Sequence, residues 1–359
     1  KDNKLKDHIK TKSTREDRGK VSFIQGNKEY YFDRILDTNT TQDEAFDVVA
    51  KHVCDDLLEG YNGTVFVYGQ SGSGKTYTMY GPENESMIIK TDDIKDDNAT
   101  SKYLGIIPRS IAHLFANLDN GNNIQLQGML DYTFEVMFLE IYCEKLRNLL
   151  KLTDTPKIRE RRIPGTKDDW ETYVDGSSWT QVKNHFETMQ LINTATKNRT
   201  VASTGLNQSS SRSHLVMLVK ITMEFGNAKR VGLGSFVDLA GSENIAKSKV
   251  QGIALKEAQK IILSLTTLSM VIEKLSDGKG LPPYKDSQLT FLLRNSLGGN
   301  CKTTLLIAAS PHVYNRNETI RSLEFGKRCR KIKNKAKQNE EMSKSQLIKE
   351  IERLTNENN

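Results

Sequence analysis

Residues 69–76, which read Gly-Gln-Ser-Gly-Ser-Gly-Lys-Thr, constrain the fold of this chain more than any other segment. The run fits the phosphate-binding template G-x-x-x-x-G-K-[ST] at every fixed position. Its glycines let the backbone adopt conformations that a side chain would forbid, so that successive N–H groups can converge on phosphate oxygens. In this pattern Lys75 supplies positive charge for the β and γ phosphates, and the Thr76 hydroxyl is the expected Mg²⁺ ligand.

The residues on either side of this run agree with it. Residues 64–68 are β-branched and aromatic, as a buried strand should be. A helix beginning near Lys75 would direct the positive end of its dipole at the phosphates. A chance glycine-rich turn is the alternative, and a strand before and a helix after make it the weaker one. We therefore assign nucleotide contacts to the whole loop: Gln70, Ser71, Gly72, Ser73, Gly74, Lys75 and Thr76.

The charge of the chain predicts a polyanionic partner. Lys and Arg outnumber Asp and Glu by 52 to 45, a net charge of +7. Nucleic acid, an anionic membrane surface and an acidic protein surface all fit, and charge alone does not choose among them. No apolar run approaches the roughly 20 residues that span a bilayer, and no signal peptide is visible. The four cysteines form no C-x-x-C pair, so we expect free thiols in a reducing compartment, the cytoplasm.

Hydrophobic periodicity predicts alternating strands and helices. A hairpin is expected at residues 21–25 and 29–32, and a capping-box pattern at Thr41 opens a helix toward Leu58. Further strands are expected at 130–142, 215–225, 230–239 and 303–309, and further helices at 106–118, 181–197 and 252–275. Residues 1–20 mix charges with few apolar anchors and are expected to be mobile. The acidic stretch at 82–103 is expected to be a long surface loop.

A second nucleotide element follows an apolar strand. Residues 238–243 read Asp-Leu-Ala-Gly-Ser-Glu and come directly after the strand residues 234–237. In nucleotide hydrolases an Asp at a strand end holds Mg²⁺, usually through water, and a following Gly N–H reaches the γ-phosphate. D-x-x-G alone is common by chance. After an apolar strand, in a chain with a phosphate loop, it indicates a γ-phosphate sensor at Asp238 and Gly241.

A third element is the serine-rich stretch at residues 207–214, which reads Asn-Gln-Ser-Ser-Ser-Arg-Ser-His. Its hydroxyls can complete a Mg²⁺ shell and hold an attacking water, and Arg212 can pair with a carboxylate such as Glu243. Taken alone, the stretch fits a solvated polar loop equally well. Hydrolysis at a γ-phosphate depends mainly on positioning and charge stabilisation, and these groups supply both.

These three runs, in this order and at these separations, resemble the kinesin motor domain. The likeness covers roughly residues 21–335 and continues in Phe32-Asp33-Arg34, Tyr61-Asn62-Gly63-Thr64, Pro283-Tyr284-Lys285-Asp286-Ser287 and Ser296-Leu297-Gly298-Gly299-Asn300. The resemblance implies a P-loop fold, a three-layer α/β sandwich whose central, mixed and mostly parallel sheet has helices on both faces. It also implies ATP hydrolysis coupled to movement on microtubules, with ATP/ADP and Mg²⁺ as cofactors.

The resemblance further implies roles for particular residues. The catalytic set is Ser210, Arg212, Gly241 and Glu243, and the metal set is Thr76, Ser211 and, through water, Asp238. Within the catalytic set, the serine would position the attacking water and the glycine would sense the γ-phosphate. The arginine and the glutamate would bridge the two switch loops, and the glutamate would relay a proton from that water.

A microtubule-binding face is implied by the loop after Glu243, the helix from Gly252 and residues 284–294. Candidate contacts with acidic tubulin are Lys157, Arg159, Arg161, Lys247, Lys249, Lys285 and Arg294. A single exposed lysine is more often a solvating charge, but the resemblance implies that these residues form a group on one face, which favours a functional role. Such contacts weaken with salt, because the screening length at physiological ionic strength is about 8 Å.

Composition indicates a mobile segment at 1–20, one globular body, a basic linker from Lys327 and then the start of an amphipathic helix. The resemblance implies that these are a motor domain at 21–326, a neck linker at 327–342 and the start of a neck helix at 343–359. The last segment has fewer than two heptads, so a coiled coil and a short capping helix both stay open. A motor core that precedes its linker resembles N-terminal motors, which usually move toward the plus end. The sequence after Ile332 resembles that of conventional kinesins. A homodimer through a longer neck helix and a location on cytoplasmic microtubules are the matching expectations.

The chain departs from the family in three places. The family's Arg-x-Arg-Pro run, which packs beside adenine, is not found, so Tyr77 is left as the candidate to stack on the base. The family reads Asn-Ile-Asn-Lys-Ser-Leu where residues 260–265 read Lys-Ile-Ile-Leu-Ser-Leu. This change puts the coupling between nucleotide site and track in question more than it does ATP binding. The acidic loop at 82–103 is an insertion near the pocket, for which a passive surface role is favoured.

Two other functions compete with that of a motor ATPase. The altered helix leaves open a kinesin-like module that binds microtubules with a weak or uncoupled ATPase. A basic P-loop protein that binds nucleic acid is the third possibility. Nothing in the chain resembles a base-reading or stacking module, so no nucleic-acid partner is expected.

Overall fold

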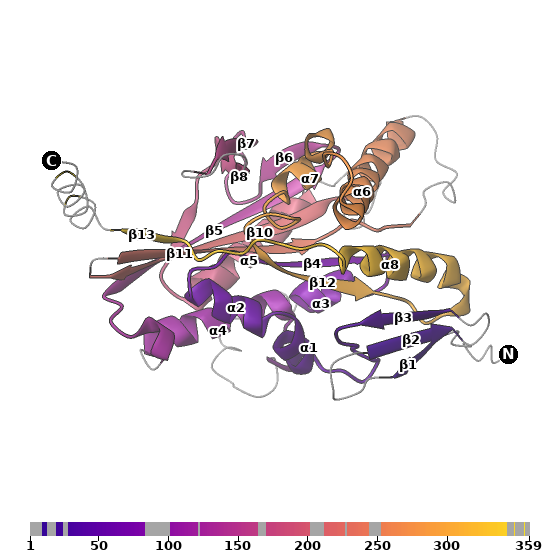
Figure 1. The fold of residues 1–359 in the computed structure, drawn as a ribbon, viewed down its shortest axis with the longest axis horizontal. Helices are drawn as coiled ribbons and strands as arrows, with labels where there is room; N and C mark the ends of the chain where they lie inside the picture. The colour runs from indigo at the N-terminus through magenta and orange to yellow at the C-terminus, as the bar shows by residue number, and fades with distance from the viewer. Residues whose placement is uncertain are drawn as a thin grey trace.

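A mixed sheet runs through the middle of the molecule (Figure 1). The computed structural model describes residues 9–12, 19–23, 28–82, 101–120, 123–163, 170–201, 212–226, 228–243 and 253–342, together with residues 348 and 355. The strand order is β12-β4-β11-β10-β5-β6, with β13 beside β11 and β9 beside β5. These strands are β4 (Gly63–Gly69), β5 (Asp131–Tyr142), β6 (Lys145–Asn148), β9 (Thr180–Val182), β10 (His214–Phe225), β11 (Ala228–Asp238), β12 (Lys302–Ala308) and β13 (Glu340–Met342).

The sheet is mixed, as expected, but fewer of its strand pairs are parallel than the sequence suggested. β4 runs parallel to both of its neighbours, β12 and β11. The pairs β10–β11, β5–β10, β5–β6, β5–β9 and β11–β13 are antiparallel. Hairpin connections account for part of the difference, because two strands joined by a tight turn must run in opposite directions. The parallel part of the sheet is therefore confined to the strands around β4, where the phosphate loop begins.

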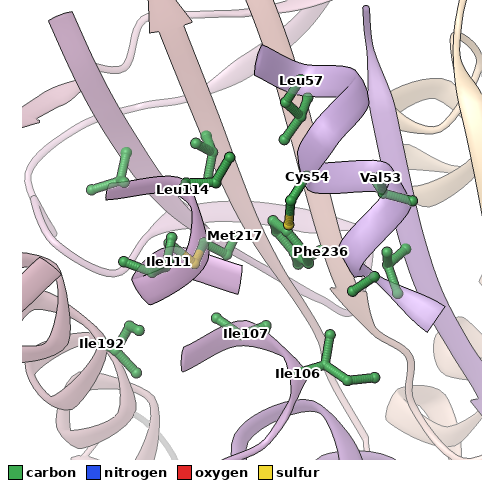
Figure 2. Close-up of a cluster of buried hydrophobic side chains, with 14 of the residues drawn as sticks. Val53, Cys54, Leu57, Ile106, Ile107, Ile111, Leu114, Ile192, Met217 and Phe236 are labelled. Atoms are coloured by element: carbon green, nitrogen blue, oxygen red, sulfur yellow. The ribbon is translucent and has the colours of Figure 1, made fainter. Parts of the chain in front are cut away.

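Helices cover both faces of the sheet, which confirms the three-layer sandwich (Figure 1). One layer consists of α1 (Gln42–Val49), α2 (Lys51–Leu58), α3 (Lys75–Tyr80), α4 (Ile106–Asn120) and α5 (His185–Val201). The other consists of α6 (Ile253–Asp277), α7 (Gln288–Leu292) and α8 (Arg316–Cys329). Figure 2 shows the apolar cluster of the first layer, in which side chains of α2, α4 and α5 pack on Met217 and Phe236 of the sheet.

Strand β4 is buried along its whole length and contributes side chains to the apolar clusters on both faces of the sheet. Val65 and Val67 belong to the cluster under α1 to α5, whereas Phe66 and Tyr68 belong to the cluster under α6 to α8. Successive side chains of a strand point to opposite faces, so a strand covered on both sides reads as a continuous apolar run. The ring of Tyr68 also stacks on Phe325 of α8, with ring centroids 3.8 Å apart.

The helix expected at residues 41–58 is two helices. Its start is as predicted: Thr41 caps α1, and the Glu44 side chain returns a bond to the Thr41 backbone, which completes a capping box. The helix is interrupted at Ala50, whose backbone (φ −125°, ψ −26°) is not helical. The Ala50 side chain is fully buried, so the change of direction is fixed by packing against the core.

A small antiparallel sheet lies beside α8. It consists of β1 (Ile9–Lys12), β2 (Gly19–Phe23) and β3 (Glu29–Phe32), in that order. The hairpin expected from the sequence is β2 and β3. Strand β1 and the start of β2 fall inside the segment at 1–20 that was expected to be mobile. Only one residue of β1 is apolar, which is why no strand pattern was visible there.

The segment that follows α8 runs extended along the core as far as β13, which pairs with β11. α8 ends at Cys329, beyond the domain boundary expected at residue 326. Asn334 Nδ2 donates to the carbonyls of Ser296 (2.9 Å) and Cys301 (2.8 Å). Further along, Asn339 Nδ2 donates to Asn62 Oδ1 at 2.7 Å. The predicted neck helix at 343–359 falls almost wholly outside the described residues.

Other expectations concern single features. All four cysteines are free, as predicted, and Cys54 and Cys301 are buried. The helices that the structure describes include none long and apolar enough to cross a membrane. Most of the expected loop at 82–103 lies outside the described residues.

Candidate functional site

The phosphate loop joins β4 to α3 and takes its shape from two glycines. Gly72 (φ +73°) and Gly74 (φ +94°) both have left-handed backbones. A Cβ at either position would meet nothing within 4 Å, so glycine is needed there for its conformation and not for space. These two glycines thus lie where the backbone turns sharply between a buried strand and a helix start. This is the geometry in which consecutive N–H groups form an anion-binding concavity.

Lys75 is a buried cation inside this loop. Its Nζ donates to the carbonyl of Gln70 at 2.9 Å. Burial lowers the pKa of Lys75, while the nearby carboxylates of Asp238 and Glu243 act to raise it. A charged ammonium with little water around it interacts strongly with any anion that enters the loop. Lys75 therefore places a buried positive charge inside the loop.

Thr76 and Asp238 are in direct contact. The Thr76 hydroxyl donates to Asp238 Oδ2 at 2.6 Å. Sheet register brings them together, since β11 runs parallel to β4 with Asp238 opposite Val67. These are two of the three predicted metal-side residues. The described residues include no cluster of three or more His, Cys, Asp or Glu side chains fit to hold a metal ion. A hydroxyl and one carboxylate suit Mg²⁺ that takes its remaining ligands from phosphate and water.

Glu243 is bonded to the phosphate loop. The backbone N–H of Ser71 donates to Glu243 Oε2 at 2.7 Å, and the Ser71 hydroxyl donates to Oε1 at 2.5 Å. A third hydrogen bond joins the same two loops: the Ser242 backbone N–H donates to the carbonyl of Gly69 at 3.0 Å. A Cβ on Gly241 would overlap the Glu243 carboxylate and the Ser71 hydroxyl, so a side chain at that position would displace this contact.

The expected bridge between Arg212 and Glu243 is not formed, although the structure describes both residues. The Glu243 carboxylate is instead satisfied by Ser71. Ser210 and Ser211, the predicted water-positioning and metal-side serines, lie outside the described residues. So do Lys247 and Lys249 of the predicted microtubule face.

Sequence reasoning missed a buried histidine beside the site. His214 begins β10 and is 2% exposed. Its Nδ1 accepts a bond from the Ala240 N–H at 3.0 Å, and its Nε2 lies 2.8 Å from the Ser264 hydroxyl of α6. Burial lowers the pKa of His214 to about 3, and the positive charges of Arg199 and Lys75 act in the same direction. The available signal was a histidine closing the serine-rich stretch at the start of a strand.

A cleft opens beside the phosphate loop. It has a volume of about 1090 Å³ and lies between the small sheet, α1 and β12. Tyr77, which is 46% exposed, lines it together with Ser73 and Thr78. The Tyr77 carbonyl accepts a bond from Gln42 Nε2 at 2.8 Å, which ties the start of α3 to α1. Within the described residues β12 pairs only with β4, so its other edge borders this cleft.

Four of the predicted microtubule contacts lie together but are paired within the chain. β7 (Lys157–Arg162) and β8 (Trp170–Asp175) form a two-stranded hairpin. The ion pairs are Arg159–Asp175, Arg161–Glu171, Lys285–Glu160 and Arg294–Glu160. Glu160 thus joins the hairpin to the α7 region, and we call β7, β8, Lys285 and Arg294 the basic surface. Lys157 opens the first strand of this hairpin and is exposed.

The comparisons with known proteins all lead to one family. The kinesin motor domain model matches residues 1–332. Kinesin-related protein 3 of Dictyostelium discoideum is 39% identical over 342 residues, which are 94% of this chain and 27% of that protein. The kinesin heavy chain of Gibberella moniliformis is 41% identical over 337 residues, 92% of this chain and 33% of that protein. The chain therefore spans about a third or less of the length of these curated relatives.

A solved structure supports the same assignment at the level of the fold. It is described as "Structure of a fast kinesin: Implications for ATPase mechanism and interactions with microtubules". Its sequence is 37% identical, its TM-score with this structure is 0.79, and the match covers 94% of this chain and 89% of that chain. With the family model matching most of its length, this chain belongs to the kinesin motor domain family.

Proposed function

We propose that this chain is a microtubule-stimulated ATPase whose hydrolysis of ATP drives movement along microtubules. The observation that carries the proposal is the double attachment of residues 238–243 to the phosphate loop. Thr76 bonds to Asp238, and Ser71 bonds to Glu243. A loop held by both of its acidic residues against the phosphate site is placed to respond to the γ-phosphate of a bound nucleotide.

ATP and Mg²⁺ are the cofactors that these residues fit. The phosphate loop and Lys75 would bind the β and γ phosphates, and Thr76 and Asp238 would hold the metal side of the site. Bound Mg²⁺ would neutralise charge that develops on the phosphate oxygens. Ser210 and Ser211 keep their predicted roles, and the aromatic face of Tyr77 in the cleft supports stacking on adenine.

The chain's own residues supply positioning and proton handling. Gly241 leaves room for its N–H to approach a phosphate, since a side chain there would overlap Glu243 and Ser71. Glu243 can accept a proton from an attacking water or pass it on, once its bonds to Ser71 are released. We propose that the bridge to Arg212 forms when Glu243 leaves Ser71, because in this structure both carboxylate oxygens are directed at Ser71.

Microtubules are the polyanionic partner that the family and the net charge of +7 support. The basic surface is the proposed contact, together with Lys247 and Lys249. Its arginines are held by carboxylates and by aromatic faces, with Arg161 5.4 Å from the centroid of Tyr173. Such preorganised cations lose little side-chain freedom when they meet an acidic surface. Plus-end direction, a homodimer through the neck and a location on cytoplasmic microtubules complete the proposal.

One observation favours the alternative of a binding module with uncoupled ATPase. Ile262 and Leu263 replace polar family residues in α6 and are 39% and 44% exposed. Apolar side chains at these positions supply no hydrogen bonds to couple the helix to the nucleotide. The two readings differ in whether microtubules accelerate turnover.

The test is the steady-state ATPase of this chain with and without microtubules, at low and at moderate salt. A large stimulation that falls with salt supports a motor. Tight microtubule binding without stimulation would support the module instead. Arg161→Ala should raise the microtubule concentration for half-maximal rate by about threefold at low salt. Lys51→Ala is the matched control, because Lys51 is also an exposed, carboxylate-paired cation but lies on α2, across the sheet from the basic surface (Figure 1).

A further inference from the structure

We infer that His214 is a positioning residue that couples the loop after β11 to helix α6 through Ser264. The inference rests on the proposed function, since it concerns how the nucleotide site reaches the helix of the proposed microtubule face. Three elements meet at this side chain: His214 begins β10, Ala240 lies between Asp238 and Gly241, and Ser264 lies in α6.

The hydrogen bonds around His214 run in one direction. The Ala240 N–H donates to Nδ1, so Nδ1 carries no proton, and a neutral imidazole then has its proton on Nε2. Nε2 can therefore donate to the Ser264 hydroxyl, 2.8 Å away. The Ser264 hydroxyl in turn donates to the carbonyl of Ile261, at 2.7 Å. These three hydrogen bonds form a continuous series from the nucleotide-side loop to the backbone of α6, and each hydrogen in the series has a single acceptor.

Burial makes this series of hydrogen bonds rigid. His214 and Ser264 are 2% and 1% exposed, and Ala240 is fully buried. The residue before the histidine, Ser213, is held by Arg199, which bonds to its hydroxyl (3.2 Å) and to its carbonyl (3.2 Å). No bulk water is at hand to replace a lost partner, so a shift of Ala240 away from Nδ1 leaves buried polar atoms unpaired unless His214 and Ser264 follow.

This arrangement bears on the residues of α6 that differ from the family. Ile262 and Leu263 lie on the exposed face of the helix, whereas Ser264 lies on its buried face. Residues 260–265 keep Ser264 in the family's order while the neighbouring polar residues are replaced. Coupling through His214 and Ser264 therefore does not depend on the replaced positions.

The first test compares Ser264→Ala with Ser276→Ala. Both hydroxyls donate to a carbonyl three residues earlier in α6, but Ser276 is only half-buried and lies far along the helix from His214. Ser264→Ala should leave the ATPase without microtubules within about twofold of wild type and lower the microtubule-stimulated rate by about tenfold. Ser264→Thr, which keeps the hydroxyl, should restore most of the stimulation, and Ser276→Ala should have no effect. Full stimulation in Ser264→Ala would overturn the inference.

A second variant tests the histidine itself. His214→Asn keeps an acceptor near Ala240 but is too short to reach Ser264. It should reproduce the loss of stimulation seen in Ser264→Ala, and the double variant should lose no more than either single one, because both break the same link. Additive losses would contradict a shared link.

Hydrogen exchange separates failure of this inference from failure of the proposed function. Adding Mg²⁺ and ADP to the wild-type chain should change amide exchange at residues 259–268, and Ser264→Ala should abolish that change while retaining nucleotide binding. This readout needs no microtubules, so it holds even where wild-type turnover is not stimulated. An equal response in wild type and Ser264→Ala would overturn the link whatever the motor activity.

Discussion

Ser71 and Glu243 lie 172 residues apart and are joined by two hydrogen bonds, from the Ser71 N–H and from its hydroxyl. The carboxylate therefore occupies a backbone donor of the phosphate loop and places a negative charge where phosphates are expected. Nucleotide and Glu243 must compete for this donor, so a bound γ-phosphate favours release of Glu243. In the proposed mechanism the loop after β11 therefore has two positions, the Ser71-bonded one seen here and a second in which Glu243 acts on water.

Glu243→Gln separates the two roles of this carboxylate. Loss of the charge should leave nucleotide affinity unchanged or raise it by up to about tenfold, because repulsion of the phosphates is removed. Turnover should fall by at least about a hundredfold, since an amide cannot accept a proton from water. Binding of a fluorescent ADP and steady-state ATPase measure the two effects. Turnover within tenfold of wild type would rule out Glu243 as the proton relay.

Thr76→Ala tests the metal side of the site. The variant loses the hydroxyl that bonds to Asp238, so the Mg²⁺ concentration for half-maximal ATPase should rise by about 10- to 100-fold. Thr78→Ala is the matched control, because Thr78 lies in the same helix and its hydroxyl only bonds back to the Gly74 carbonyl. Equal Mg²⁺ requirements in the two variants would show that Thr76 is not a metal ligand.

Gly74→Ala and Gly278→Ala form a second matched pair. Both glycines have positive φ, +94° and +64°, and both have open space where a Cβ would lie. Each substitution should therefore lower the free energy of unfolding by about 1–2 kcal/mol through backbone strain. Only Gly74→Ala should weaken nucleotide binding, since Gly278 lies beyond the end of α6, away from the loop. Denaturant unfolding and nucleotide titration would measure both effects, and an equal loss of binding in the two variants would contradict the assignment.

Much of the site was predictable because its residues are close in sequence. The phosphate loop is one run, with its glycines, Lys75 and Thr76 fixed by local backbone chemistry. Thr76 and Asp238 were each expected on the metal side of the site, but their direct hydrogen bond is visible only in the folded chain. The sequence did not determine which of several candidate partners a side chain would contact. Glu243 had Arg212 as a plausible partner, and only the folded chain shows that Ser71 takes it.

The elements that sequence patterns missed share a weak apolar signal. Helix α8 buries Leu323 and Phe325 but also Thr319, Ser322 and Gly326, so its core face does not read as hydrophobic. Strand β13 has three residues and owes its existence to pairing with β11. His214 and Ser264 are 50 residues apart and polar, and nothing in their local sequence marks them as partners. Tertiary packing determines whether such elements and contacts form, and a local sequence pattern does not reveal that packing.

Asn334→Ala should release the segment that follows α8. The Asn334 amide donates to Ser296 and Cys301, and its oxygen accepts from the Gly298 N–H at 2.7 Å. Loss of these bonds should cost about 1–3 kcal/mol and speed amide exchange at residues 335–342 by roughly 10- to 100-fold. Gln338→Ala removes a single exposed bond to the Glu59 carbonyl and should have a much smaller effect. Equal exchange rates in the two variants would argue against Asn334 as the anchor.

His214 predicts how stability depends on pH. Its pKa is about 3 in the folded chain against 6.5 when exposed, so the unfolded chain binds a proton in a range where the folded chain does not. Stability from this residue is complete above about pH 7 and is lost as pH falls toward 3, because protons then favour the unfolded state. Between about pH 7.5 and pH 5 the loss should be about 2 kcal/mol.

The comparison that isolates this residue is His214→Asn, which does not titrate. Urea unfolding at a series of pH values should give a shallower loss of stability in the variant than in the wild-type chain, by about 2 kcal/mol at pH 5. Other groups that titrate in this range contribute equally to both proteins and cancel in the difference. Parallel curves would mean that His214 is protonated as readily in the folded chain as in the unfolded one. The imidazole could not then be the neutral link between Ala240 and Ser264, because a protonated Nδ1 cannot accept the Ala240 N–H.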